Sequence, residues 1–300
     1  MDRISTFGNT NSLIQQTMQV QATYAAKQAQ TASGLKSESY SGIASDSQQL
    51  LSLESMYSRI TGQVAAGNAA ENRMNSMSST LGSISSLITS SMSTLSAAMS
   101  GTGTSGSTAT SADLQQDLSE LVSLLNSSYG GQYLFGGAVT DTAPVNTSAS
   151  GYNPLGGSAD TTYYQGDSNT TSVAVSDTLT VNYGITADNP AFEQALRALA
   201  VAVANPTDTT QLQSAYDLLS SASDGVSSIS SDLGNKIKTV DNQVTLQSTT
   251  LTHLDSTISD LRNVDVASVS VQLSEIETQL EAAYGSLTKL LSLNLTDYLR

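Results

Sequence analysis

The stretch GQYLFGGAVTDTAPV, residues 131–145, interrupts a chain built largely from Ser, Thr, Gln, Ala and Leu. Its most distinctive residues are aromatic, apolar or glycine: Tyr133, Leu134, Phe135, Gly136 and Gly137. Glycine permits backbone angles that other residues resist, and large apolar side chains can fill the base of a small domain. We predict that these five residues form a domain base, where a helical segment ends and a strand-containing segment begins.

Long apolar stripes lie on both sides of this stretch. Residues 45–100 carry apolar side chains at spacings of mostly three and four, and one continuous helix there would be about 80 Å long. A second stripe occupies residues 226–261, and a third runs from Val266 to Leu290. Such stripes are typical of helices that pack along one face, and packing within the chain is the simpler interpretation. We therefore expect two long antiparallel helical rods.

Between the rods the pattern changes from helix to strand. After a Gly, Ser and Thr linker at 100–112, a short helix is expected at 113–128, with Asp113 as its N-cap. The stretches TTYYQGD, TTSVAVSD and TLTVNYG then alternate β-branched residues and are interpreted as strands. Pro190 is expected to begin a helix that Asn205 and Pro206 end.

The fold class expected from these patterns is mainly α: a long antiparallel helical rod or coiled coil from both termini, with a small α+β, strand-containing central insert domain. The expected segments are an N-terminal core helix at 1–44, N-terminal rod helices at 45–130, the insert domain at 131–190, returning rod helices at 191–263 and a C-terminal core helix at 264–300. The first segment carries too few apolar side chains along one face to stabilise an isolated helix, so we expect residues 1–44 to be disordered before assembly.

The two end segments have no evident partner except each other. We expect them to pair mainly when neighbouring subunits supply further apolar surface. The predicted subunit-interface residues are the apolar positions of these two segments: Ile4, Phe7, Leu13, Val20, Leu273, Ile276, Leu280, Leu287 and Leu290.

Composition excludes several functional classes. A formal net charge of -15 repels nucleic acid and anionic membrane surfaces, so neither is an expected partner. With no cysteine and a single histidine, the chain has almost nothing from which to build a zinc site or a Ser-His-Asp triad. We predict no enzyme, and neither catalytic residues nor a cofactor or metal site. The N-terminus lacks the apolar run of a cleavable secretory signal.

Several stretches, in order along nearly the whole chain, resemble the bacterial flagellin superfamily. They are RIST at 3–6, ASGLKSESYSGIASD at 32–46, the midpoint stretch at 131–145, YYQGD at 163–167 and LEAAYGSLTKLLSLNLTDYL at 280–299. The aromatic-Leu-Phe-Gly-Gly run followed by YYQGD is similar to hook-associated junction proteins rather than to filament flagellin.

This resemblance implies terminal coiled coils in an inner core, a layer of helical rods and a strand-containing outer domain. It also implies that the protein is secreted in an unfolded state through the flagellar type III pathway, and that it has a structural role at the junction of hook and filament. The implied partners are further copies in a ring or helical assembly, an adjacent hook-associated protein, flagellin and an export chaperone. Alternatives are a minor filament flagellin, a secreted adhesin or enzyme that uses the strands, and a coiled-coil signalling rod.

Overall fold

The computed structural model describes the backbone of residues 2–101 and 107–292, and the side chains of residues 8, 10–101 and 110–289. The chain divides into two compact units. The terminal unit comprises residues 1–59 and 250–300, and the insert unit comprises residues 60–249. Two long helices, α2 (Ser47–Met99) and α5 (Thr209–Arg262), contribute to both.

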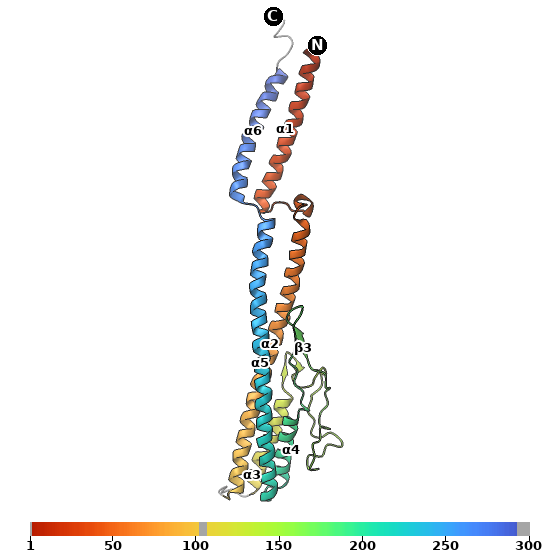
Figure 1. Ribbon diagram of the computed structural model, residues 1–300, viewed down its shortest axis with the longest axis vertical. Helices are drawn as coiled ribbons and strands as arrows, with labels where there is room; N and C mark the ends of the chain where they lie inside the picture. The colour runs from red at the N-terminus through yellow and green to blue at the C-terminus, as the bar shows by residue number, and fades with distance from the viewer. Residues whose placement is uncertain (1, 102–106, 293–300) are drawn as a thin grey trace. The chain divides into compact units, whose positions relative to one another are not determined.

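The terminal unit contains a pair of helices from opposite ends of the sequence. Helices α1 (Asp2–Ser33) and α6 (Val266–Ser292) lie side by side and run antiparallel (Figure 1). Gly34 ends α1 with a φ of 71°, a left-handed angle that suits glycine. An antiparallel bridge between Leu35 and Asn263 then joins the end of α1 to the start of α6.

Polar contacts fix the connection that follows α1. The short 3₁₀ helix η1 (Tyr40–Ile43) places the Tyr40 hydroxyl where it donates to Glu54 Oε2 at 2.6 Å. The other oxygen of that carboxylate pairs with Arg262 at 3.1 Å. The ammonium of Lys36 donates to the carbonyl of Asp260 at 2.7 Å. These contacts tie the start of α2 to the end of α5 inside the terminal unit.

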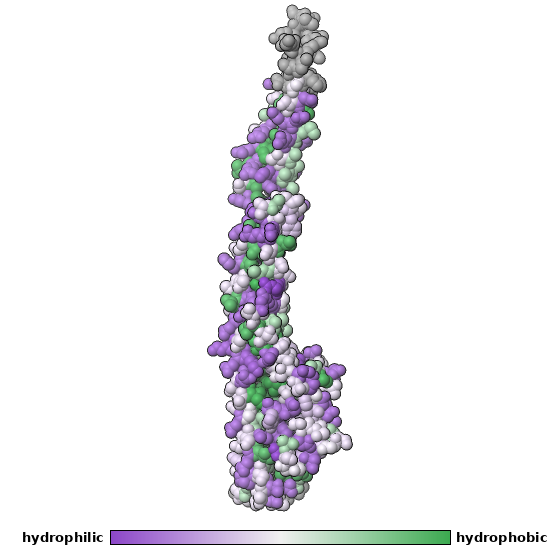
Figure 2. Space-filling model, turned by 45° about the vertical axis from the view of Figure 1, so that its right-hand side comes forward, coloured by the Kyte–Doolittle hydropathy of each residue, from purple (hydrophilic) through white to green (hydrophobic). Residues whose placement is uncertain are grey.

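The insert unit contains the hydrophobic core. Its segments of α2 and α5 run antiparallel (Figure 1). The side chain of Gln247 on α5 donates to that of Gln63 on α2, and one turn further along α2 Gly67 lies against Val244 of α5. Helices α3 (Ser107–Leu125) and α4 (Pro190–Ala204) pack on each other and complete the helical layer. The parts of the first two predicted stripes that lie in this unit form its inner faces, because Met74, Leu81 and Val226 are fully buried. The visible surface of this unit is mainly hydrophilic or neutral (Figure 2).

Strand structure within the described residues is limited to two short hairpins. Strands β1 (Ser128–Tyr129) and β2 (Gln132–Tyr133) pair antiparallel around Gly130 and Gly131, whose φ angles are 59° and 79°. Two consecutive positive φ values are the signature of the type I′ turn, which glycine favours. Strands β3 (Ser172–Ala174) and β4 (Thr180–Asn182) form the second pair.

The expected fold class, mainly α with a small strand-containing insert, is confirmed, but two local predictions were wrong. Helix α3 begins at Ser107, so Asp113 lies inside it and is not its N-cap. The stretch TTYYQGD forms turns with one isolated bridge between Tyr164 and Val145, not a strand. The side chain of Tyr163 is buried, and its tertiary contacts override the β pattern of the sequence.

Candidate functional site

The α1–α6 pair has a thin and incompletely packed seam. Leu13 and Val20 on α1 are half-buried, and between them lies the buried Thr17, whose hydroxyl bonds to the Leu13 carbonyl. On α6, Val269 and Leu280 are buried. The apolar stripe is therefore more continuous on α6 than on α1, where polar side chains occupy part of the inner face.

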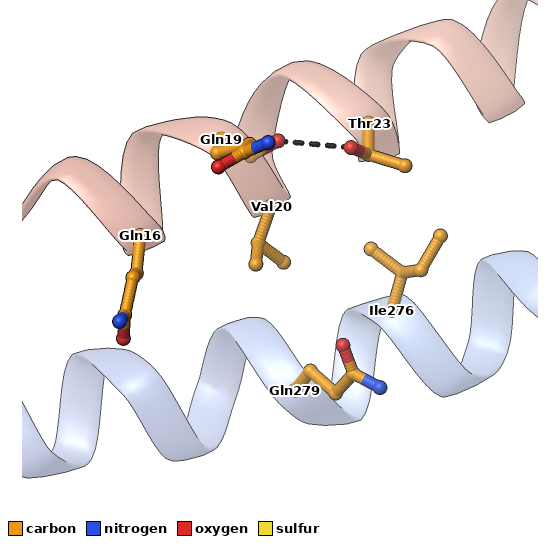
Figure 3. Close-up of a pocket in the computed structure, with 6 residues that line it drawn as sticks. All are labelled: Gln16, Gln19, Val20, Thr23, Ile276 and Gln279. Atoms are coloured by element: carbon orange, nitrogen blue, oxygen red, sulfur yellow. Dashed lines mark hydrogen bonds between the residues drawn. The ribbon is translucent and has the colours of Figure 1, made fainter. Parts of the chain in front are cut away.

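An open hollow of about 420 Å³ lies along the seam. Its walls come from both helices: Gln16, Gln19, Val20, Thr23, Ile276 and Gln279. Figure 3 shows Val20 and Ile276 extending from opposite helices into this space. The Thr23 hydroxyl does not reach across, because it donates to the carbonyl of Gln19 at 2.9 Å. The two helices thus leave room that their own side chains do not fill.

The structure brings together six of the predicted interface residues on the two facing helices. Leu280 is buried, and the others are half-buried: Leu13, Val20, Leu273, Ile276 and Leu287. The side chains of Ile4, Phe7 and Leu290 lie outside the described residues. Within the single chain, the six described positions contribute to the pairing of α1 with α6.

Sequence reasoning missed a second set of apolar residues that remain exposed on the same helices. They are Ile14, Met18, Val271 and Tyr284. Val266, which begins the third predicted stripe, is exposed as well. Met18 and Val271 are each 63% exposed. The signal that could have found part of this set is the i, i+4 pair of Ile14 and Met18, which lies off the main stripe of α1. Each of these side chains keeps apolar surface that becomes buried only when another molecule covers it.

The apolar residues of the predicted domain base pack into the interior of the insert unit. Leu134 and Phe135 are buried, and the Phe135 ring meets Phe192 of α4 edge to face at 5.9 Å. Tyr133 is half-buried at the margin. The amide of Ala187 donates to the Phe135 carbonyl at 2.9 Å, which attaches the start of the α4 region to the midpoint stretch.

The paired glycines make room for the YYQGD motif. Gly137 has a φ of 73°, and a Cβ there would collide with the carboxylate and carbonyl of Asp167. That carboxylate accepts from the Ala138 amide at 2.6 Å, which lowers the pKa of Asp167 from its usual value. A Cβ on Gly136 would collide with the carbonyl of Val139. Two motifs that are separate in sequence therefore form one structural element.

Tyrosines of this region are held in their neutral form. Tyr163 is fully buried, donates to the Ala187 carbonyl at 2.8 Å and meets the Tyr152 ring at 5.3 Å. Burial raises the pKa of Tyr163, and it raises the pKa of Tyr152 to about 12. Both phenols therefore stay protonated near neutral pH, and that of Tyr163 serves as a hydrogen-bond donor in the packing.

Within the described residues, no three potential ligands of the His, Cys, Asp and Glu types gather at one place. Across the same part of the chain, no helix has the length and apolar character needed to span a membrane. We take the α1–α6 pair as the candidate functional site, because a hollow and the exposed apolar side chains Met18 and Val271 lie on the same two helices.

Comparisons with known proteins agree with this arrangement. Residues 216–299 match the family model of the bacterial flagellin C-terminal helical region. A putative flagellar hook-associated protein from Vibrio parahaemolyticus has a similar structure, with a TM-score of 0.64 at 19% identity, covering 74% of this chain and 100% of that one. FlgL from Bacillus cereus gives a TM-score of 0.57 at 17% identity, covering 70% of this chain and 99% of that one. No curated protein matches in sequence.

The matched segment includes most of α5 and all of α6, so it covers the C-terminal half of the candidate site. Both comparisons lead to structural rather than enzymatic proteins, as the sequence predicts. They also confirm the resemblance that the sequence motifs indicate. Residues 216–299 thus match the bacterial flagellin C-terminal helical region, and the fold is similar to that of solved flagellar hook-associated proteins.

Proposed function

We propose that this chain is a structural protein of the bacterial flagellum that forms the junction between hook and filament. Its terminal helices α1 and α6 carry the helical self-association of copies into a ring or helical array outside the cell. The neighbours at its two ends are an adjacent hook-associated protein and flagellin. The observation that carries the proposal is the thin α1–α6 seam, with a hollow inside it and apolar side chains exposed outside it.

The free energy for assembly comes from burying these apolar side chains. Full burial of one large apolar side chain contributes about 1.5–3 kcal/mol. Met18 and Val271 are mostly exposed in the single chain, so most of that contribution is still available to a neighbouring copy. Contacts between different surfaces of identical copies generate rings or open helical arrays, the geometry that an axial tube requires.

Ordering of the ends is coupled to this association. We expect residues 1–44 to be disordered before assembly, because the seam buries too little apolar surface to offset the entropy of two long helices. An unfolded end suits export through the flagellar type III pathway, with a chaperone bound until release. In the assembled state, residues 1–44 and 264–300 form core helices, 45–130 and 191–263 form rods, and 131–190 form the outer insert.

The test replaces exposed apolar residues without disturbing the inner seam. A double variant, Met18→Ser with Val271→Ser, is expected to be secreted and to keep the helicity of the unaltered monomer, yet to leave hooks without attached filaments. The matched control is Gln21→Ser with Gln272→Ser, which changes exposed polar residues of the same helices. Normal filament attachment in the first variant, or after deletion of residues 280–300, contradicts the proposed role of the terminal helices.

A minor filament flagellin is the second candidate, because residues 216–299 match the C-terminal helical region of flagellin. The two functions differ in the length of flagellum over which copies of the protein assemble. A filament protein, once purified, polymerises by itself into long filaments, whereas a junction protein occupies a short zone at the end of the hook. Labelling the protein along intact flagella distinguishes them.

A further inference from the structure

A groove in the insert unit, away from the terminal helices, contains a buried positive charge. Its volume is about 460 Å³. The walls are the α2 residues Ala66, Ala69, Ala70 and Arg73, the first hairpin with Tyr129, Gly130 and Gln132, and the residues Thr171, Ser172, Val173 and Tyr183 of the second hairpin region. Small alanine side chains on α2 keep the groove open between the helix and the two hairpins.

Arg73 is only 8% exposed, although it is permanently charged. Its Nη1 donates to Gln132 Oε1 at 3.2 Å, and its Nη2 donates to the carbonyl of Tyr133 at 2.8 Å. Both acceptors are neutral, and a guanidinium has five N–H donors. Among the ion pairs that the described residues form, none involves Arg73.

The pKa shift of Tyr183, another residue of the groove wall, also shows the charge of Arg73 and no nearby carboxylate. Burial raises the pKa of Tyr183, and the charge of Arg73 acts in the opposite direction. No carboxylate contributes to that shift. The groove therefore has a positive potential that nothing in its own walls neutralises.

A buried charge is normally kept in proteins by an opposite charge, because two neutral hydrogen bonds do not replace its lost hydration. Carboxylates fit the planar fork of a guanidinium and accept two of its N–H groups together. The chain itself is rich in carboxylates, with 26 acidic against 11 basic residues. Each copy therefore presents many acidic side chains to its neighbours and few basic ones.

We infer that this groove receives a carboxylate side chain from a second copy of the chain and that Arg73 binds it. The inference rests on the self-association proposed above, but it assigns a second contact, in the insert unit rather than in the terminal helices. In the assembly, the carboxylate lies between the two hairpins and supplies the counter-charge that Arg73 lacks in the single chain.

The first experiment separates binding from folding. Hooks isolated from cells that lack the protein are titrated with purified full-length protein, and the concentration that gives half-maximal binding is measured. Arg73→Met is expected to raise this concentration about tenfold or more. Its unfolding temperature is measured alongside, because the variant also loses the hydrogen bonds to Gln132 and Tyr133. Lys238→Met, which removes an exposed positive charge from the same unit, is the matched control and is expected to bind as the unaltered protein does.

An unchanged half-maximal concentration for Arg73→Met overturns the inference and leaves the proposed function standing, because the unaltered protein still binds hooks. Failure of the unaltered protein to bind hooks instead contradicts the proposed function. The two failures are thus distinguishable.

A second experiment keeps Arg73 in place and also covers the case in which Arg73→Met fails to fold. The photoreactive residue benzoylphenylalanine replaces Tyr129, a partly exposed residue of the groove wall, and a mixture of isotope-labelled and unlabelled copies is assembled on hooks and irradiated. The expected product joins position 129 to an Asp- or Glu-containing peptide of a second copy. The same photoreactive residue at the exposed Leu155, outside the groove, is not expected to give that product. Cross-links to another protein, no cross-link, or the same product from position 155 overturn the inference.

Discussion

In the insert unit, Met74, Leu81 and Phe135 are completely shielded from water, whereas in the α1–α6 pair the hydroxyl-bearing Thr17 is among the best-buried side chains. The insert unit fills its interior with side chains from helices and loops together. The terminal pair leaves a hollow between Val20 and Ile276 and exposes Met18 and Val271. This difference in packing is the basis of the proposal that a neighbouring copy covers the apolar surface of the terminal pair.

Removing the aromatic ring at the domain base is expected to have the largest effect. Phe135→Ala leaves a cavity beside Phe192 and lowers the free energy of unfolding by about 3–5 kcal/mol. Urea unfolding followed by circular dichroism measures this loss. The control Leu155→Ala changes a side chain that is 55% exposed, and its effect stays within about 0.5 kcal/mol. A similar small loss for Phe135→Ala contradicts the picture of a tightly packed insert unit.

Adding a single methyl group to α2 tests the packing between α2 and α5. The Cβ of Gly67→Ala lies 2.5 Å from Val244 Cγ2, so the variant is expected to lose about 1–3 kcal/mol of unfolding free energy. Gly62→Ala on the same helix meets nothing within 4 Å and gains about 0.5–1 kcal/mol through helix propensity. Opposite signs in urea unfolding are the expected result. A gain at both positions indicates that the rods are loosely packed.

A smaller effect is expected when α6 itself is strengthened. Gly285 meets nothing within 4 Å, so Gly285→Ala removes backbone freedom without a clash and stabilises the helix by about 0.5–1 kcal/mol. Hydrogen exchange in α6 is expected to slow about two- to fivefold, with no change in the insert unit. Slowing of exchange throughout the insert unit contradicts a stabilising effect confined to α6.

The smallest effect concerns pH and the loops of the insert unit. The Ala138 amide lowers the pKa of Asp167, and the Thr162 hydroxyl lowers that of Asp160. A carboxyl with a depressed folded pKa stabilises the fold above its unfolded pKa, about 3.9, and this contribution is lost as pH falls through the folded pKa.

The unfolding temperature of the insert unit is therefore expected to be level from pH 7 to about 5 and to decrease below about pH 4. Asp167→Asn is expected to make that decrease shallower, because the variant has no carboxyl to protonate at this position. Parallel curves for the variant and the unaltered protein contradict the role assigned to the Asp167 hydrogen bonds.

The long helices could be predicted from sequence because their signal is local and repeated. The stripe at 45–100 corresponds to α2, and the stripe at 226–261 lies within α5, which begins at Thr209. The helix that Pro190 begins was also predictable, since the Asn189 side chain caps it by accepting from the Ala191 amide at 3.0 Å. Caps and helical periodicity act within one or two turns of chain.

The loops and the exposed face could not be predicted in the same way. The Tyr163 stretch has a strand-like pattern, but a hydrogen bond to Ala187, distant in sequence, fixes it as a turn. Gly67 lies within the apolar stripe of residues 45–100, and only the approach of Val244 shows why a glycine is there. Met18 and Val271 lie off the main stripes, so only the packed helices show that they stay exposed.

The sequence by itself determined the mainly α class, the long helices, the exclusion of cysteine chemistry and the motifs that resemble the flagellin superfamily, because composition, periodicity and short motifs are properties of neighbouring residues. Only the tertiary structure decided that the midpoint and YYQGD motifs form one element, that Arg73 is buried without a carboxylate, and that the terminal seam is incompletely filled. These features depend on contacts between residues far apart in the chain, which no local pattern encodes.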